Sequence, residues 1–322
     1  YGDPSSTQSA LVVPLPGSDT IYYIFTSDIG AEDGLDFGFN YSIVDMTLDG
    51  GLGDITSKNI NLLQESSEKI TAVLKDCASE SIWVIVLSNV NDTLPLPGEP
   101  ASYDTYYAYE VTTTGINTIP VKSTFTTQIR DARGQMKVSP NGKKLISANM
   151  NGGLHLYDFD TSTGIVSNQQ TLTITSFPSF FAYGVEFSQN SLRLYVHSHN
   201  GQGANAEANL HRSQLTQFDL SDLSIQASEF TIDERQLYRG SLQLGPDGRI
   251  YRALSKTYRD NPNDPDDGGI PFLGVIENPN DLGADVVYTH EGVDLSPNLS
   301  MQGLPPFIQS FFNDQIDIIQ NG

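Results

Sequence analysis

The sequence predicts an all-β protein, a β-propeller built from four-stranded blades. Two short apolar runs joined by a polar turn recur five times, Tyr and Phe occur 15 times each, and no amphipathic helical segment exceeds about 10 residues. One such hairpin is marginal alone, so its repetition indicates copies that stack on one another. Units of roughly 45 to 60 residues with about four strands are typical of propeller blades.

The repeated hairpin is most regular in the middle of the chain. It is seen as "KVSPNGKKLISA" from Lys137, "EFSQNSLRLYVH" from Glu186 and "QLGPDGRIYRAL" from Gln243, with looser copies at 10–25 and 69–88. A third strand is expected after each hairpin, at 40–48, 105–115, 154–164, 215–223 and 271–283, and a fourth behind most of them, as at 286–290. The units therefore predict sequential blades around one axis, with 10–25 in an inner position.

A glycine precedes the first strand of successive units. These residues are Gly134, Gly184, Gly240 and Gly303. Innermost strands crowd around a propeller axis, where a residue without a Cβ allows close backbone approach. The alternative is that these glycines only end strands.

Composition and charge exclude several classes of partner. With 17 basic against 39 acidic residues the net charge is −22, which disfavours binding to nucleic acid or to anionic membranes. The excess of acidic residues would attract cations or simply keep a secreted protein soluble. There is no run of 18 apolar residues, and direct membrane insertion is not expected. The single cysteine, Cys77, excludes an internal disulfide and is interpreted as an inert thiol.

Several stretches, in order, resemble one family of bacterial surface proteins. They include "SSTQSALVVPLPGSDTIYYIFTSD" from Ser5, "NYSIVDMTLDGGLGDIT" from Asn40, "LQLGPDGRIY" from Leu242 and "GLPPFIQSFF" from Gly303. The chain resembles the N-terminal propeller of large Bacteroidota cell-surface adhesins, which are associated with gliding motility and exported by type IX secretion. In that family, immunoglobulin-like or polycystic-kidney-disease-type repeats follow the propeller. The resemblance implies a secreted or outer-surface location.

The resemblance also implies an organisation into domains. It assigns 1–312 to a propeller that has seven blades when complete, of which about six are represented here and an N-terminal one is missing from the chain. The stretch 304–312 is expected to begin the last blade as a strand. Residues 313–322 are expected to form an exit strand or a linker to a following domain.

Two stretches carry side chains that bind metals. His197 and His199 point to one face of a strand, and His211 could return from the loop to complete a transition-metal site, with Glu207 as a further ligand. The alternative is an ordinary polar insertion. Farther along, calcium is a possible cofactor of an acidic loop, which is otherwise a solvated loop. Its candidate ligands are Asp260, Asp264, Asp266 and Asp267.

Aromatic residues near strand entries are candidates for ligand contacts. Tyr103 and Phe180 could stack on sugars or on a partner's loop. Tyr107, Tyr109, Phe181 and Tyr183 alternate along strands and are expected in the core between blades.

The resemblance implies one kind of modification. Bacteroidota attach O-glycans at an Asp followed by Thr or Ser and an apolar residue, which predicts Thr20 and Thr93 as acceptors. Thr105 is a weaker candidate, because a bulky tyrosine follows it. Coincidence remains the alternative for so short a pattern.

Function is predicted at the level of class. The leading interpretation is a non-catalytic secreted or surface propeller that binds a polysaccharide, a surface or a protein partner, as the head of a large adhesin. One alternative is a propeller enzyme of the glycoside hydrolase, lyase or lactonase type, with a polar site at the axial opening. Another is a structural cap recognised by the secretion or motility apparatus. Nucleophile-elbow, phosphate-loop and zinc-protease motifs are absent, and Glu186 is the one carboxylate nominated inside an innermost strand.

Overall fold

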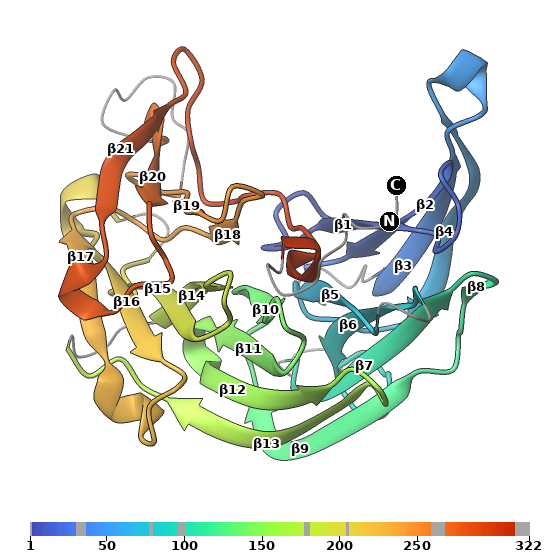
Figure 1. Ribbon diagram of the computed structural model, residues 1–322, viewed down its shortest axis with the longest axis horizontal. Coiled ribbons are helices and arrows are strands. Elements are labelled where there is room, and N and C mark those ends of the chain that lie inside the picture. Colours follow the sequence, from blue (N-terminus) through green and yellow to red (C-terminus); the bar gives the residue numbers. More distant parts are fainter. Residues whose placement is uncertain are drawn as a thin grey trace.

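Five antiparallel β-sheets are arranged around a common axis in the computed structural model (Figure 1). The structure describes residues 2–29, 37–76, 80–95, 101–176, 181–203, 206–258 and 268–312. The sheets follow one another in chain order, and in each the chain runs from the innermost strand outward. This confirms the all-β propeller of four-stranded blades. The described residues form five sheets, which differs from the six to seven blades expected.

The strands of each sheet follow the repeated units of the sequence. Sheet 1 contains β1 (Ala10–Pro14), β2 (Ile21–Ser27), β3 (Phe39–Asp45) and β4 (Asp54–Leu63). Sheet 2 contains β5 (Ile70–Leu74), β6 (Ile82–Ser88) and β7 (Tyr103–Thr112), whose outer edge pairs with the two pieces β8 (Gly115–Ile116) and β9 (Val121–Ile129). Sheet 3 contains β10 (Met136–Val138), β11 (Lys144–Asn149), β12 (Gly153–Asp160) and β13 (Ile165–Leu172).

The last two sheets have the same order. Sheet 4 contains β14 (Phe181–Phe187), β15 (Arg193–His199), β16 (Ser213–Asp219) and β17 (Phe230–Arg235). Sheet 5 contains β18 (Leu242–Leu244), β19 (Ile250–Arg252), β20 (Phe272–Ile276) and β21 (Tyr288–Asp294). The helices among the described residues are short 3₁₀ turns: η1 (Asp49–Gly51), η2 (Met150–Gly152), η3 (Ala208–Leu210), η4 (Ile225–Ser228), η5 (Gly283–Asp285) and η6 (Gln309–Phe312). The hairpin at 10–25 forms the inner pair β1 and β2, as expected.

Apolar side chains fill the spaces between consecutive sheets. One buried cluster joins sheets 1 and 2, a second joins sheets 2 and 3, a third joins sheets 3 and 4, and a fourth joins sheets 4 and 5. Tyr107 and Tyr109 belong to the first of these clusters, as the alternation along their strand predicted. Burial of this apolar surface is the main force that holds the blades together.

Side chains near the axis satisfy the backbone of the innermost strands, whose inner edges have no further strand to pair with. Gln8 bonds both the N–H and the carbonyl of Met136, at 2.8 and 3.1 Å. The side-chain carbonyl of Gln135 accepts hydrogen bonds from the amides of Val185 and Leu242, at 3.1 and 2.9 Å. These glutamines therefore link the inner strands of four different sheets.

Close approach at the axis explains three of the four glycines. A Cβ at Gly184 would lie 2.4 Å from the carbonyl oxygen of Gly240, and a Cβ at Gly240 would lie 1.7 Å from that of Ala253. A Cβ at Gly134 would likewise lie 2.3 Å from the carbonyl oxygen of Ala148. The prediction was wrong for Gly303, where a Cβ would meet no atom within 4 Å.

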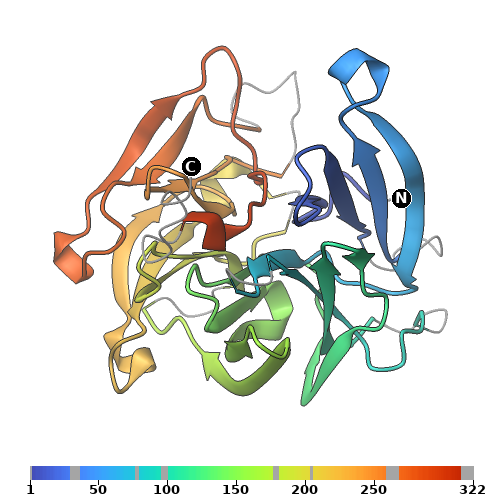
Figure 2. The same ribbon diagram turned by 45° about the vertical axis from the view of Figure 1, so that its right-hand side comes forward.

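The C-terminal segment 300–312 lies between the inner ends of sheets 5 and 1 (Figures 1 and 2). Ile308 is buried in the cluster between sheets 1 and 2, and Phe312 packs against the cluster between sheets 4 and 5. The strand expected at 304–312 is absent, because Pro305 and Pro306 have no N–H for a ladder and the chain instead ends in η6. This stretch therefore packs against existing blades, and among the described residues it begins no new one.

Some sequence predictions fall outside the described residues. They are the exit strand or linker at 313–322 and the thiol of Cys77. Within the described ranges, no helix has the length and apolar character needed to cross a bilayer.

Candidate functional site

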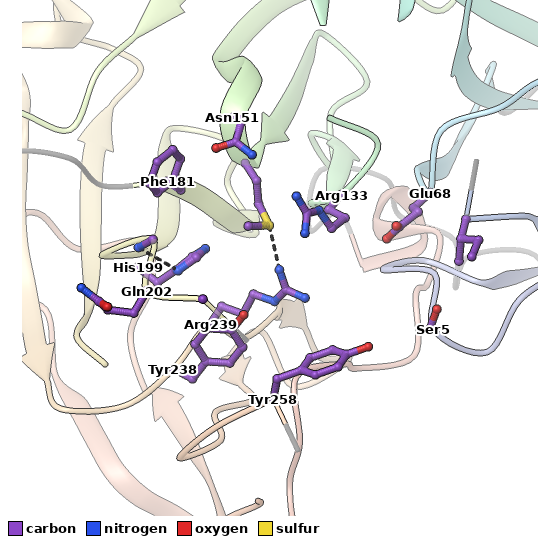
Figure 3. Close-up of a pocket in the computed structure, with 14 residues that line it drawn as sticks. Ser5, Glu68, Arg133, Asn151, Phe181, His199, Gln202, Tyr238, Arg239 and Tyr258 are labelled. Atoms are coloured by element: carbon purple, nitrogen blue, oxygen red, sulfur yellow. Dashed lines mark hydrogen bonds between the residues drawn. The ribbon is translucent and has the colours of Figure 1, made fainter. Parts of the chain in front are cut away.

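A cavity of about 390 Å³ lies where the chain enters the innermost strands. We call this side of the propeller the entry end, and the side where those strands finish the far end. The lining comes from all five sheets, because each contributes the residues next to its innermost hairpin (Figure 3). The side chains used below are Glu68, Arg133, Asn151, Phe181, His199, Gln202, Tyr238, Arg239 and Tyr258.

Arg239 lies in the middle of the cavity lining, immediately before β18 (Figure 3). Its guanidinium carbon is 4.7 Å from the ring centre of Tyr183, 5.2 Å from that of Tyr238 and 5.8 Å from that of Tyr258. Its Nε donates to the side chain of Gln302 at 2.5 Å. The residue is 6% exposed, yet it forms no ion pair with any described carboxylate. The guanidinium therefore makes cation–π contacts with three aromatic rings, whereas a buried arginine is usually paired with a carboxylate.

His199 ends β15 beside Phe181, with which it is paired in the ladder. Its Nδ1 accepts a hydrogen bond of 3.2 Å from the N–H of Gly201, so the ring proton is assigned to Nε2. That Nε2 is buried and has no hydrogen-bond partner among the described residues. Burial, reinforced by the positive charge of Arg239, lowers the pKa of His199 to about 3. At neutral pH, His199 is therefore a neutral N–H donor without an acceptor.

Glu68 is the carboxylate of the described lining, and it precedes β5. Its Oε2 accepts hydrogen bonds from the backbone N–H and the hydroxyl of Thr7, at 2.8 and 2.6 Å. The same hydroxyl accepts a bond from the amide of Gly134, which ties the entries of three sheets together. Burial raises the pKa of Glu68 above its usual value, although the bonds from Thr7 oppose the shift.

The basic groups Arg133 and Lys69 lie beside the cavity, but both are already engaged. Arg133 donates two bonds to Asp131, at 2.8 and 2.7 Å. Burial alone would raise the pKa of Asp131, but the bonds and charge of Arg133 outweigh it and hold the pKa at about 2. Lys69 donates to the backbone carbonyls of Ala132 and Arg133, and burial lowers its pKa to about 8.

The predicted histidine metal site does not form. His197, His199 and His211 are all buried, but among the described residues no group of three His, Cys, Asp or Glu side chains is placed to hold a metal ion. Nδ1 of His197 accepts a hydrogen bond of 3.0 Å from the guanidinium of Arg252. The lone pair that a metal ion would need on this nitrogen is therefore occupied. His211 instead packs against Tyr238, with the rings tilted by 52° and their centres 4.4 Å apart.

The aromatic predictions for the site divide three ways. Tyr103 is wrong as an exposed ligand contact, because it is 1% exposed and belongs to the core between sheets 2 and 3. Phe180 lies outside the described residues. Phe181, expected in the core, instead lines the cavity, and Tyr183 is buried beneath Arg239.

The remaining candidate sites lie elsewhere. Asp260, Asp264, Asp266 and Asp267, the predicted calcium ligands, are outside the described residues. Thr20 is half-buried at the turn before β2 and Thr93 is exposed, and their glycosylation stays a prediction. Thr105 is wrong as a weaker acceptor because it is fully buried.

Glu186 is also occupied, at the far end of the axis. It accepts hydrogen bonds from the amide of Leu244 and the side chain of Gln309, at 2.9 and 3.2 Å, and pairs with Lys137 at 3.2 Å. With these partners it links β10, β14, β18 and the C-terminal segment. We therefore interpret it as a structural carboxylate.

The sequence contains one local signal for the cavity, which the predictions above do not include. An arginine directly precedes the axial glycine in two units, as Arg133-Gly134 and Arg239-Gly240. The glycine brings the backbone close to the axis, and the preceding side chain then reaches into the axial opening. The other lining residues come from separate loops that no single stretch of sequence brings together.

Comparisons with known proteins assign neither a family nor an activity to the chain. No family model and no curated protein matches the chain. Solved structures that it is similar to include a GH74 enzyme from Niastella koreensis (13% identity, TM-score 0.44, covering 90% of this chain and 38% of that one). Others are a xylan β-1,4-xylosidase from Bacillus halodurans C-125 (12%, 0.41, 95% and 60%) and an ulvan lyase of family PL25 (10%, 0.46, 92% and 76%). Identities and TM-scores this low transfer no activity to the chain.

Proposed function

We propose that this protein is a glycan-binding propeller that takes part of a polysaccharide into the cavity at its entry end. The observation that carries the proposal is the lining itself. Phe181, Tyr238 and Tyr258 place aromatic rings around a cavity of about 390 Å³, and Asn151 and Gln202 add side-chain amides. Cavities of roughly 300–1,000 Å³ with a few fixed polar groups are typical ligand sites.

The chemistry of a sugar fits this combination of side chains. The C–H face of a pyranose packs on an aromatic ring, while its hydroxyl groups exchange hydrogen bonds with amides and carboxylates. Because the lining is attached to the ends of packed strands, it is held in place before the ligand arrives, and less binding free energy is lost to ordering.

A secreted or outer-surface location is part of the proposal. It is supported by the resemblance to the propellers of Bacteroidota adhesins, in which the domain would present its entry end outward. Recognition by the secretion or motility apparatus would then concern another surface of the same domain.

A propeller enzyme is the second candidate, and Glu68 favours it. A carboxyl group whose pKa is raised by burial can keep a proton and donate it to a leaving oxygen. Asp131 does not supply the second carboxylate of a hydrolase, because both of its oxygens are bonded to Arg133. Release of reducing ends or unsaturated products from a polysaccharide panel, lost in Glu68→Gln, would establish this candidate.

The binding proposal is tested by screening the protein against a polysaccharide panel and repeating the positive cases with Tyr258→Ala. Tyr258 is 44% exposed at the cavity, so its loss should weaken binding with little effect on folding. The matched control is Phe230→Ala, since Phe230 is 39% exposed on the outer strand of sheet 4. Equal binding by both variants, or no bound polysaccharide, would contradict the proposal.

A further inference from the structure

We propose that the sugar bound in the entry-end cavity is a hexuronate, whose carboxylate is held by Arg239 and His199. The inference rests on the proposed glycan-binding function and adds the class of ligand. It depends on two donors without described acceptors, Nη2 of Arg239 and the buried Nε2 of His199, on the charge of the lining, and on the position of Glu68.

Arg239 is the first donor. Among the described residues its guanidinium bonds only the side chain of Gln302 and the sulfur of Met150, which leaves Nη2 without a hydrogen bond. The charge of Arg239 acts on Glu68 but the two form no ion pair, so a ligand carboxylate can still gain a charge-assisted hydrogen bond from the guanidinium. A carboxylate is the partner that matches the planar fork of an arginine.

His199 is the second donor, and it is fixed in that role. Its Nδ1 is occupied by the Gly201 amide, and Nε2–H is buried without an acceptor. An unmatched buried donor is costly, and beside a cavity the acceptor of a ligand can offset that cost. Figure 3 shows the imidazole beside Arg239 on the same side of the cavity.

The charge of the described lining is opposite in sign to that of the whole protein. The chain carries a net charge of −22, whereas the charged side chains of the described lining are Arg133 and Arg239 against Glu68. An anionic ligand would be repelled by the surface as a whole and attracted here. The charge of the described lining therefore favours an anionic group in this cavity.

The opposite side of the cavity limits the ligand to one anionic group. Glu68 and Ser5 lie across from His199, with Arg239 between them (Figure 3). A carboxyl group at that position can exchange hydrogen bonds with the hydroxyl groups of a sugar. Its negative charge would repel a second anionic group of the ligand. Together with the rings of Phe181 and Tyr258, this favours a sugar acid over a phosphate-dense ligand or an acidic peptide.

The ligand side of the proposal can be tested on the unaltered protein by calorimetry. Trigalacturonate carries charged carboxylates, whereas its methyl ester has the same sugar chain with each carboxyl neutralised by a methyl group. We expect the acid to bind at least about 10-fold more tightly, because hydrogen bonds to charged groups contribute roughly 1.5–3 kcal/mol. A peptide with a free C-terminal carboxylate serves as a competitor.

The protein side is tested with Arg239→Gln and His199→Phe, which should each weaken binding of the acid by about 10-fold or more and remove the preference over the ester. Arg249→Gln is the matched control, since this exposed arginine lies at the far-end turn of sheet 5, and it should bind like the unaltered protein. Unfolding midpoints check that the variants are folded.

Equal binding of acid and ester would overturn the hexuronate while leaving glycan binding intact. The same holds if other polysaccharides bind and neither oligomer does. If the peptide alone binds, both this inference and the glycan-binding function are wrong. A preference for the acid that Arg239→Gln and His199→Phe both retain would also overturn the assignment to these two residues.

Discussion

Both ends of the propeller axis contain buried polar side chains on or next to the innermost hairpins, but it is at the far end that the buried charged groups are paired with one another. There, Lys137 pairs with Glu186 and donates to Gln243 at 2.6 Å, while Glu186 also accepts a bond from Gln309. At the entry end, Arg239 and His199 retain donors without acceptors among the described residues.

The difference teaches how to separate structural from functional polar groups inside one fold. A satisfied buried network stabilises one arrangement of the blades, because each member loses its partners if the strands move. An unsatisfied group lowers stability and is retained only where another use compensates for it. Variants at the two ends should therefore behave differently, and the following predictions run from the largest expected effect to the smallest.

Lys137→Met should have the largest effect on stability. It leaves the charge of Glu186 buried without its cationic partner, and breaking a buried ion pair in this way costs about 3–5 kcal/mol of unfolding free energy. Denaturant unfolding measures the loss. The double variant Lys137→Met/Glu186→Gln should recover much of it, and a single-variant loss below about 1 kcal/mol would show that the far end is not a matched network.

Ile308→Ala should have the second-largest effect on stability, because this side chain anchors the C-terminal segment in the cluster between sheets 1 and 2. Truncation of a buried isoleucine costs about 2–4 kcal/mol. The neighbouring Phe307, 53% exposed, provides the control, since Phe307→Ala should change stability by less than about 0.5 kcal/mol. Similar losses for both would mean that Ile308 does not anchor the segment in this cluster.

Acid should destabilise the entry end through His199. The unfolded imidazole titrates near its usual pKa, whereas the folded one is held neutral down to about 3, so the unfolded state binds more protons below about pH 6.5. Stability contributed by the neutral ring is present above that pH and is lost as the pH falls. Between pH 7 and pH 5, the expected loss is about 2 kcal/mol, and His199→Phe should remove it. Parallel pH profiles for the two proteins would contradict this.

The smallest effect is expected from His199→Phe at pH 7. The substitution removes a buried donor that has no partner, and the Gly201 amide that loses its acceptor is exposed, so stability should change by less than about 1 kcal/mol. At the far end, Ser310→Ala deprives the Leu74 amide of its bond of 2.9 Å and should cost about 1 kcal/mol or more. A reversed order of the two would argue against the distinction between the ends.

The sequence predicted the fold better than the site, for a physical reason. Hairpins such as 137–148 are local and repeated, so their apolar alternation and turns can be read directly, and β10 and β11 formed there. The extra blade was expected from the family resemblance, which assigned 304–312 to a strand although its two prolines cannot join a ladder. The cavity was missed because its lining comes from five separate strand entries, and the one local signal is an arginine before an axial glycine.

The most direct test of the entry-end assignment is a crystal structure of the protein with bound trigalacturonate. The account predicts a sugar ring against Tyr258 or Phe181, with one carboxylate within about 3 Å of both the Arg239 guanidinium and Nε2 of His199. A ligand bound outside the cavity, or inside it with its carboxylates turned away from these two donors, would contradict the claim that the unmatched groups of the entry end exist to bind a sugar acid.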